Sequence, residues 1–373
     1  MATKTLSASS KMGVCPSSTR AALDVREAPA APSYTRLGSL CAGGVTTCLC
    51  GPDGALFVGY DSGFVSHHAR PFHAKGSSGA ESTGWSAHGS RAVTRLSLGG
   101  GTLASASRDA TVALWRVHGG GGAPAEAGAL QPPAFPAAVL RGHELTVSAV
   151  DVTPDGCAVA SGSRDCSVRV WDAATAREAC APAHTPQNVV TCLQWARGSG
   201  QLPPQALLQG GEDLRVRLWD TRHGLLNEAG ALEGFTYFPL SLDASADGWH
   251  VATSSKGFNG VGCEVRLWDL RALGGGSRAS GASGARGSKA LLRTYIGHSQ
   301  DATAVVFLSD AGIASGSKDG TVRVWAQEEG AEHLVLPIPG ASINSLAACK
   351  DGVAAGCAEA HGVALFPSIQ KCS

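Results

Sequence analysis

The sequence has no excess of charge of either sign, which argues against one large class of functions. Its 373 residues contain 30 basic and 30 acidic side chains. Proteins that bind nucleic acids need a clustered excess of Lys and Arg to neutralise phosphates. We therefore expect no nucleic-acid partner. No apolar run approaches the roughly 20 residues that a membrane-spanning helix requires, so we expect no such helix either.

Cysteine pairs and catalytic motifs are also missing. The 12 cysteines are irregularly spaced, include no C-x-x-C pair and follow no recognisable secretory signal, a usage typical of reduced thiols in the cytoplasm. The sequence has no nucleophile elbow, phosphate-binding loop, dinucleotide fingerprint or zinc-protease motif. His67, His68 and His73 lie close together without a recognisable fourth ligand. We expect neither enzymatic activity nor a cofactor or metal site.

A repeated phrase is the main positive signal. It reads SASRDATVALW, SGSRDCSVRVWD, GGEDLRVRLWD, CEVRLWD and SGSKDGTVRVW, and two degenerate copies flank these five. In chain order the tryptophan positions are His68, Trp115, Trp171, Trp219, Trp268, Trp325 and Phe366. They are separated by 47, 56, 48, 49, 57 and 41 residues, the length of four short strands with their turns. The period predicts an all-β propeller with seven blades.

Each copy has the pattern of a strand, a turn and a second strand. An Asp follows a short run of small residues, and Asp can bond its own backbone in a tight turn. Apolar residues such as Val168 and Val170 then alternate with polar ones, as in a strand buried on one face. About half a period upstream lies a His. His88, His143 and His298 precede their tryptophans by 27, 28 and 27 residues, and His184 precedes Trp219 by 35.

These features resemble the WD40 family, whose repeat runs from Gly-His to Trp-Asp. In that family the His, a strand Ser or Thr, the turn Asp and the Trp form a hydrogen-bonded tetrad. Metal binding or catalysis would be other uses for the histidines, but a polar set repeated in four blades favours a structural role. The resemblance implies tetrads at His88, Asp109 and Trp115; at His143, Ser161 or Ser163, Asp165 and Trp171; at His184, Asp213 and Trp219; and at His298, Asp319 and Trp325.

The ends of the repeat region predict how the ring closes. Only seven residues follow Phe366, too few for a fourth strand in the last blade. In WD40 propellers an N-terminal strand completes the final blade and removes the exposed sheet edge. The strand-like segment 34–41 is our candidate for that strand, within a propeller domain of residues 34–373.

Residues 1–33 are rich in Ala, Ser, Thr and Pro and have no hydrophobic period, which predicts a disordered tail. An organelle transit peptide is the alternative. Within this segment Met12, Gly13 and Cys15 match a pattern for N-myristoylation with a second acyl site. This pattern would associate the protein with membranes only if translation began at Met12.

Two Gly-rich insertions, near 117–138 and 273–290, each follow the third strand of a blade. The topology places both on the rim opposite the Gly-His loops. Such sequences usually serve as flexible spacers, and a docking arm is the alternative.

Blade five departs from the pattern. Trp268 has no Gly-His before it, and the segment 254–264 replaces the tight turn. This segment, with Phe258 at its tip, is either a recognition element or a substitute for the missing tetrad.

Exposed charges beside the turn Asp are either partner contacts or ordinary solvated surface. With Phe258, the candidate contacts are Arg108, Arg164, Glu212, Lys256 and Lys318.

A propeller fold alone does not decide a function. The segments 188–195, 212–222 and 256–271 are similar to stretches of an animal WD-repeat protein associated with cilia. The similarity implies a non-catalytic scaffold or adaptor for other proteins, in the cytoplasm or the cilium. The alternative is a substrate receptor of a cullin-4 RING ubiquitin ligase, implied by W-D-x-R motifs that end at Arg222 and Arg271.

Overall fold

The computed structural model places Ser33–Ser373 in one compact unit. It describes residues 34–37, 41, 43–69, 71–72, 82–117, 135–185, 188–196, 206–222, 226–274, 290–308, 312–326, 332–358 and 362–367. The predicted tail, with Gly13, and most of both Gly-rich insertions lie outside these residues. Within the described part of the chain, no helix has the length and apolar character needed to span a membrane.

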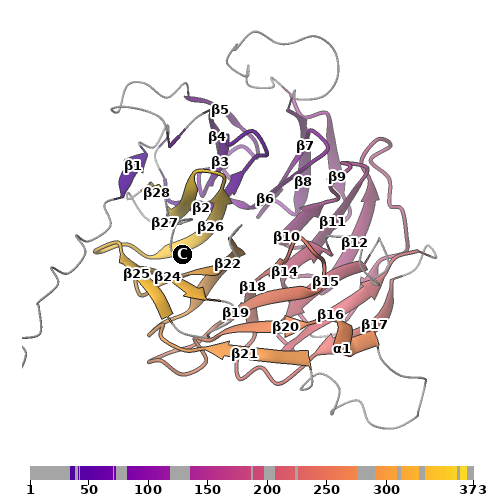
Figure 1. The fold of residues 1–373 in the computed structure, drawn as a ribbon. Helices are drawn as coiled ribbons and strands as arrows, with labels where there is room; N and C mark the ends of the chain where they lie inside the picture. Colours follow the sequence, from indigo (N-terminus) through magenta and orange to yellow (C-terminus); the bar gives the residue numbers. More distant parts are fainter. Residues whose placement is uncertain are drawn as a thin grey trace, which may run out of the picture. The chain divides into compact units, whose positions relative to one another are not determined.

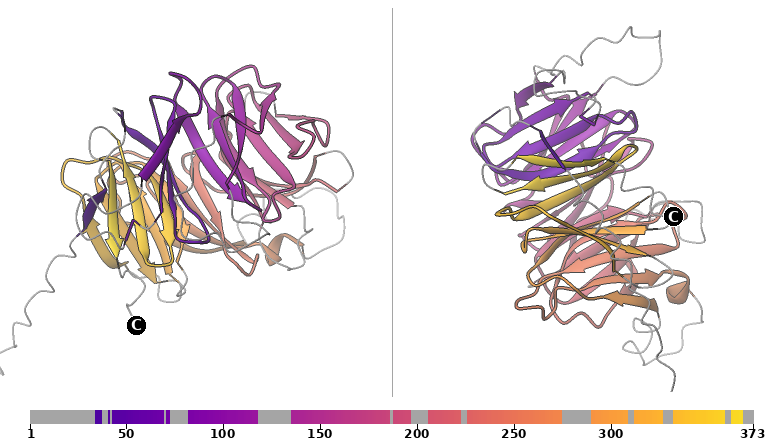
Figure 2. Two further views of the ribbon diagram at one scale, coloured as in Figure 1. Left: turned by 90° about the horizontal axis from the view of Figure 1, so that it is seen from above. Right: turned by 60° about the vertical axis from the view of Figure 1, so that its left-hand side comes forward.

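Seven four-stranded antiparallel sheets surround a central axis, which confirms the predicted all-β, seven-bladed fold (Figures 1 and 2). Blade one contains β2 (Val45–Cys50), β3 (Leu56–Tyr60), β4 (Phe64–His68) and β5 (Ser82–Ser86); blade two contains β6 (Val93–Gly99), β7 (Thr102–Ser107), β8 (Thr111–Arg116) and β9 (Ala138–Arg141). Blade three contains β10 (Val147–Val152), β11 (Ala158–Ser163), β12 (Ser167–Asp172) and β13 (Ala183–His184); blade four contains β14 (Val190–Trp195), β15 (Ala206–Gly211), β16 (Arg215–Asp220) and β17 (Asn227–Leu232).

Blade five contains β18 (Pro239–Ala244), β19 (His250–Ser255), β20 (Val265–Asp269) and β21 (Leu291–Tyr295), with the short helix α1 (Arg271–Gly274) after β20. Blade six contains β22 (Ala302–Phe307), β23 (Gly312–Ser317), β24 (Thr321–Ala326) and β25 (Glu332–Pro337). Blade seven contains β26 (Ile343–Cys349), β27 (Gly352–Cys357), β28 (Val363–Pro367) and, from the start of the unit, β1 (Thr35–Leu37).

Strand β1 closes the ring, as the sequence predicts. Thr35, Arg36 and Leu37 pair antiparallel with Leu365, Ala364 and Val363 of β28. The Tyr34 ring lies 5.6 Å from the Phe366 ring, measured between centroids. The observed strand is shorter than the predicted segment 34–41, of which residues 38–40 are not described.

The repeated tryptophan position has the same register in all seven blades. Each such residue pairs with an apolar residue of the second strand, for example Trp171 with Val159. His68 pairs with Leu56 and Phe366 pairs with Val353, so both degenerate copies occupy the predicted position. Apolar residues of neighbouring sheets form the core: one of the seven clusters joins Leu114 of blade two to Trp171.

The loops divide between two faces of the ring. We name the His face after the loops that lead into the first strands; it also carries the turns between the second and third strands. In each blade the first N–H of that turn donates to a carbonyl just before the first strand, as from Arg164 to Thr146 (3.0 Å). The described residues that flank both Gly-rich insertions, such as Arg116 and Ala138, lie toward the opposite face.

Hydrogen bonds between first strands join neighbouring blades near the axis. Thr94 donates to Val147 O (2.5 Å), and the hydroxyls of Ser148, Thr191 and Thr303 donate in the same way to the next blade. Across the closing seam, Asn344 Nδ2 donates to Val45 O (2.9 Å). Because these donors sit at equivalent strand positions, they fix the radial position of each blade relative to the next.

Ring closure gives a first prediction. A chain lacking residues 1–40 loses β1 and exposes the edge of β28, so it should lose roughly 2–4 kcal/mol of stability and aggregate more readily. A chain lacking only residues 1–33 keeps β1 and serves as the control. Thermal denaturation and size-exclusion chromatography provide the measurements, and equal melting temperatures for the two chains would contradict closure by β1.

Candidate protein-binding surface

Blade three contains a complete hydrogen-bonded tetrad. His143 Nδ1 lies 2.9 Å from Asp165 Oδ2, and His143 Nε2 lies 2.8 Å from Ser161 Oγ. Trp171 Nε1 donates to the same hydroxyl (2.8 Å). Because a carboxylate only accepts, Nδ1 carries the imidazole proton and Nε2 accepts from the serine. Of the two candidate serines, Ser161 therefore completes the tetrad, whereas Ser163 accepts from the Asp165 N–H (3.1 Å).

Blades two and six repeat this arrangement. The distances from His Nδ1 to the Asp carboxylate, from His Nε2 to the Ser hydroxyl and from Trp Nε1 to the same hydroxyl are 2.9, 2.8 and 3.0 Å in blade two. In blade six they are 3.0, 2.7 and 2.8 Å. The residues are His88, Ser105, Asp109 and Trp115, and His298, Ser315, Asp319 and Trp325. All three histidines are buried, so each imidazole links a loop to a turn within its own blade.

Charge in the tetrad is concentrated on the aspartate. Burial opposes ionisation of Asp165, but hydrogen bonds from Ser167, the Glu144 N–H and His143 lower its pKa to about 2. Burial lowers the pKa of His143 despite the neighbouring carboxylate. The ground state at neutral pH therefore combines an ionised aspartate with a neutral imidazole. This arrangement stabilises the loop, and its polar atoms are all engaged within the blade.

The predicted tetrad of blade four does not form: His184 lies elsewhere, and the Asp213 carboxylate pairs with Arg217 instead of an imidazole. His184 is an exposed residue of β13, where it pairs with Ser167 in blade three. Asn188 lies two residues before β14, and its Oδ1 accepts from the Asp213 N–H (3.2 Å), as Ser163 Oγ accepts from the Asp165 N–H in blade three. Trp219 Nε1 donates to Gln209 Oε1 (2.7 Å) rather than to a serine. The GSGQLPP insertion follows β14, so it does not lengthen the loop that holds this position.

Blade five replaces the imidazole with a phenyl ring. Phe235 lies four residues before β18, as His143 lies four before β10, and its ring is 5.2 Å from the Trp268 ring. Trp268 Nε1 donates to Thr253 Oγ1 (2.9 Å). Arg266 covers the other side, with its guanidinium carbon 5.2 Å from the Phe235 centroid. Packing therefore substitutes for part of the hydrogen bonding in this blade.

In blade one, His68 replaces the tryptophan and retains a polar role. Its Nε2 lies 2.9 Å from Ser66 Oγ and its Nδ1 lies 2.8 Å from Ser82 Oγ. Burial, with a smaller contribution from His67, lowers the pKa of His68 to about 4. His73 lies outside the described residues. Among those that are described, no group of three or more His, Cys, Asp or Glu side chains is arranged to hold a metal ion.

The long turn of blade five is rigidly held. Phe258 and Val261 exchange both backbone hydrogen bonds (2.9 and 3.0 Å), and Asn259 and Gly260 have φ of 50° and 77°. This is the geometry of a two-residue type I′ hairpin, which Asn-Gly favours. Gly262 also has a positive φ of 80°, and a Cβ there would lie 2.0 Å from the ring of Tyr237. The turn therefore depends on its glycines.

The same turn is attached to blade six. Gly260 N–H donates to Ser299 O (3.0 Å), and Gly257 N–H donates to Asp301 Oδ1 (3.0 Å). Asp301 in turn pairs with Lys318 Nζ (2.8 Å). The Phe258 side chain is not part of these contacts and is 70% exposed. The loop thus makes substitute contacts with its neighbour, which is one of the two alternatives for segment 254–264, and leaves an aromatic ring exposed to solvent.

Exposed apolar residues gather on one part of the His face. Most of the large exposed apolar side chains in the described chain belong to His-face loops of blades three to six: Leu145, Leu214, Tyr237, Phe258, Val261 and Ile296. We call Tyr237, Lys256, Phe258, Val261 and Lys318 the blade-five surface. Lys256 and Lys318 are exposed on this surface, whereas Arg108 and Arg164 are exposed on blades two and three.

Arg222 and Arg271 lie on the opposite face. Arg222 donates from Nε and Nη2 to the two carboxylate oxygens of Asp220 (2.9 and 2.6 Å), and Arg271 does the same to Asp269 (2.9 and 2.8 Å). The guanidinium carbon of Arg271 also lies 5.5 Å from the centroid of the Trp249 ring. Each W-D-x-R arginine therefore closes its own turn while remaining partly exposed.

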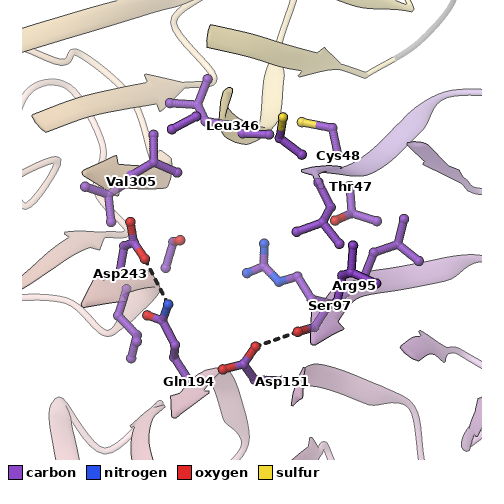
Figure 3. A pocket seen from close by; sticks show the side chains of 18 of the residues that line it. Thr47, Cys48, Arg95, Ser97, Asp151, Gln194, Asp243, Val305 and Leu346 are labelled. Atoms are coloured by element: carbon purple, nitrogen blue, oxygen red, sulfur yellow. Dashed lines mark hydrogen bonds between the residues drawn. The ribbon is translucent and has the colours of Figure 1, made fainter. Parts of the chain in front are cut away.

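The seven first strands enclose a channel of about 450 Å³ (Figure 3). Asp151 accepts from Ser97 Oγ (2.6 Å) and from Trp195 N–H (2.8 Å). Asp243 accepts from Gln194 Nε2 (2.8 Å) and from Phe307 N–H. These side chains form a polar belt across blades two to six, in which each residue binds the next blade.

The comparisons with known proteins agree with this geometry. The family model described as "WD domain, G-beta repeat" matches residues 80–116, 135–172 and 289–326, which contain the three complete tetrads. The chain contains WD40 repeats. A solved structure described as the WD40 beta propeller domain of Doa1 covers 90% of this chain and 97% of its own, with a TM-score of 0.66 and 18% identity. That likeness shows the fold.

Three curated relatives illustrate the range of proteins that share these repeats. Nuclear distribution protein PAC1 of Coccidioides posadasii is 27% identical over 50% of this chain and 40% of its own length. Mitochondrial division protein 1 of Kluyveromyces lactis is 29% identical over 51% of this chain and 28% of its own length. The ribosome biogenesis protein WDR12 homolog of Drosophila sechellia is 26% identical over 60% and 59%. The matched regions thus span less than two thirds of each relative.

Sequence reasoning missed several residues of the WD40 propeller. Phe235 replaces the tetrad histidine, and a count of four residues back from the first strand, rather than a search for His, would have found it. Asn188 lies only two residues before β14, so that count does not reach it. Gln209 replaces the strand serine and could have been found from its position ten residues before Trp219. Arg95, which points into the channel, follows no repeated motif. Its position becomes meaningful only once the first strands form a ring.

The corrected tetrads lead to a paired prediction. Substitution His143→Ala leaves Asp165 and Ser161 without their partner and should cost about 1–3 kcal/mol. His184→Ala removes an exposed side chain and should change stability by less than about 0.5 kcal/mol. Urea denaturation followed by tryptophan fluorescence measures both, and a larger loss for His184→Ala would refute the assignment.

His68 predicts a dependence of stability on pH. Its pKa is lower in the folded chain than in the unfolded one, so its stabilising contribution is complete above pH 6.5 and declines as the pH falls toward 4. The free energy of unfolding should fall by roughly 2–3 kcal/mol across this window through His68 alone. His68→Gln should show a smaller fall in parallel denaturation curves, and an unchanged pH dependence would exclude this role.

Proposed function

We propose that this WD40 propeller is a non-catalytic adaptor that binds other proteins through the blade-five surface. The observation that carries the proposal is Phe258, an exposed ring on a hairpin fixed by backbone bonds to blade six. Aromatic anchors contribute much of the energy in protein interfaces, and a preformed loop loses little entropy on binding. Lys256 and Lys318 beside the ring add charge that can orient a partner.

We further propose that the partners act in cilia-related trafficking or assembly, with the protein in the cytoplasm and the cilium. The support is the similarity of segments 188–195, 212–222 and 256–271 to WD repeat-containing protein 31 of animals. The last of these segments includes the unusual hairpin of blade five, so the similarity falls on the surface that we propose to bind. The relatives named above are described by nuclear distribution, mitochondrial division and ribosome biogenesis, and they favour no single process.

A second candidate function is that of a cullin-4 substrate receptor, for which the two W-D-x-R motifs are the supporting observation. Arg222 and Arg271 both lie on the opposite face and retain part of their exposed surface. Each guanidinium is already paired with the carboxylate of its own motif. A ligase adaptor would therefore have to compete with Asp220 and Asp269, which makes this candidate the weaker of the two.

Proximity labelling in the source cells tests the proposal. Phe258→Ala should reduce labelling of the main partners several-fold, because it removes the exposed anchor without a buried contact. Leu292→Ala is the matched control, since Leu292 is an exposed apolar residue of β21 outside the His-face loops. Equal labelling by the wild type and Phe258→Ala would reject the blade-five surface as the binding site.

The identity of the labelled proteins separates the two functions. Ciliary trafficking subunits that depend on Phe258 support the first proposal. Cullin-4 adaptor subunits that depend on Arg222 and Arg271 support the second. A third set of proteins that depends on Phe258 would keep the adaptor function and reject the ciliary assignment.

A further inference from the structure

Arg95 is a cation inside the ring without an anion of its own. It lies on β6 and points toward the axis of the channel (Figure 3). With the residues that the structure describes, its guanidinium makes no hydrogen bond and no ion pair, and Asp151 acts on it only through its charge. Loss of water around the side chain lowers the pKa of Arg95. A guanidinium in this environment is stabilised by an oxyanion.

The carboxylates of the channel are engaged elsewhere. Asp151 receives its hydrogen bonds from Ser97 and Trp195, and Asp243 receives its bonds from Gln194 and Phe307. These bonds hold neighbouring blades together, so the acids cannot turn toward Arg95 without breaking the belt. The two acids of the channel are therefore bonded to other blades and leave Arg95 without a hydrogen-bonded anion.

Arg95 is also accessible from the His face. Besides the main cavity, it lines a second one of about 370 Å³ that we call the channel mouth. Lys256, Lys318 and Asp301 line the same mouth. Asp301 is paired with Lys318 and accepts from Gly257 N–H, and the Lys256 ammonium lies 4.9 Å from the Phe238 ring centroid. Three cations and one acid give the mouth a net positive charge.

We propose that the channel mouth binds a carboxylate side chain from an acidic segment of a partner protein, with Arg95 holding the carboxylate. This inference rests on the proposed function, because Lys256 and Lys318 belong both to the blade-five surface and to the lining of the mouth. Phe258 and Val261 of that surface would bind apolar residues of the same segment. The planar fork of Arg can donate two parallel hydrogen bonds to one carboxylate. Lys256 and Lys318 attract the acidic segment and fix its direction at the rim.

The test uses the full-length protein and a fluorescein-labelled hexaglutamate peptide, with binding measured by fluorescence anisotropy at low salt. The wild type should bind hexaglutamate but not hexaglutamine. Arg95→Gln should weaken binding about tenfold or more, the effect expected for loss of a hydrogen-bonded charged partner. Arg95→Lys should recover part of the affinity, because it restores the charge but not the fork.

Two matched variants test whether the effect is local. Lys350→Gln removes a cation near the other end of the channel, and Arg164→Gln removes an exposed cation of the His face on blade three. Both should bind hexaglutamate within about twofold of the wild type, because neither side chain lines the channel mouth. Equal losses in all three variants would indicate nonspecific attraction and overturn the proposal, as would unchanged binding in Arg95→Gln.

Competition identifies the source of the anion, and melting curves separate binding from folding. Excess inorganic phosphate that displaces hexaglutamate where equal acetate does not would overturn the assignment to a carboxylate.

Because Arg95 has no partner to lose, Arg95→Gln should melt at or above the wild-type temperature. A lower melting temperature would assign Arg95 a structural role. The peptide assay needs no cellular partner, so its failure is distinguishable from failure of the labelling experiment.

Discussion

The pairing of β1 with β28 is the contact on which the rest of the propeller depends. Three residues near the start of the unit complete a sheet whose other strands come from its end. Without them, β28 would be the outer strand of the last blade and would expose an unpaired edge. Nearer the axis, each first strand contacts the next, from β2 around to β26 and back to β2. Every blade then has two neighbours, and none depends on its own repeat alone.

This closure explains why the individual blades can diverge. Among the residues that the structure describes, only blades two, three and six keep the complete His–Ser–Asp–Trp tetrad. Blade four uses Asn188 and Gln209, and blade five uses Phe235 under Arg266. The bonds between first strands compensate in part, because Thr191 of blade four donates to Pro239 O of blade five (2.6 Å) across the interface between two modified blades.

The sequence predicts the parts of this fold that repeat. The interval between tryptophan positions indicates seven blades, and the spare strand before blade one indicates how they close. The assignment of His184 fails because a search for the nearest histidine ignores which side of the first strand carries the insertion. The exposure of Phe258 and the contacts of its hairpin with Ser299 and Asp301 are also beyond the sequence. They depend on how blade six is placed beside blade five.

The channel shows most clearly what periodicity leaves undetermined. Arg95 and Asp151 are each the single charged residue of a strand whose sequence is otherwise ordinary for β-structure. Closure brings both to the axis, where Asp151 bonds to blades two and four while Arg95 bonds to neither neighbour. The difference follows from reach, since the short Asp side chain meets the adjacent strand whereas the long Arg side chain extends past it. One charge therefore stabilises the ring, and the other is left facing the channel mouth, which Lys256 and Lys318 of the blade-five surface also line.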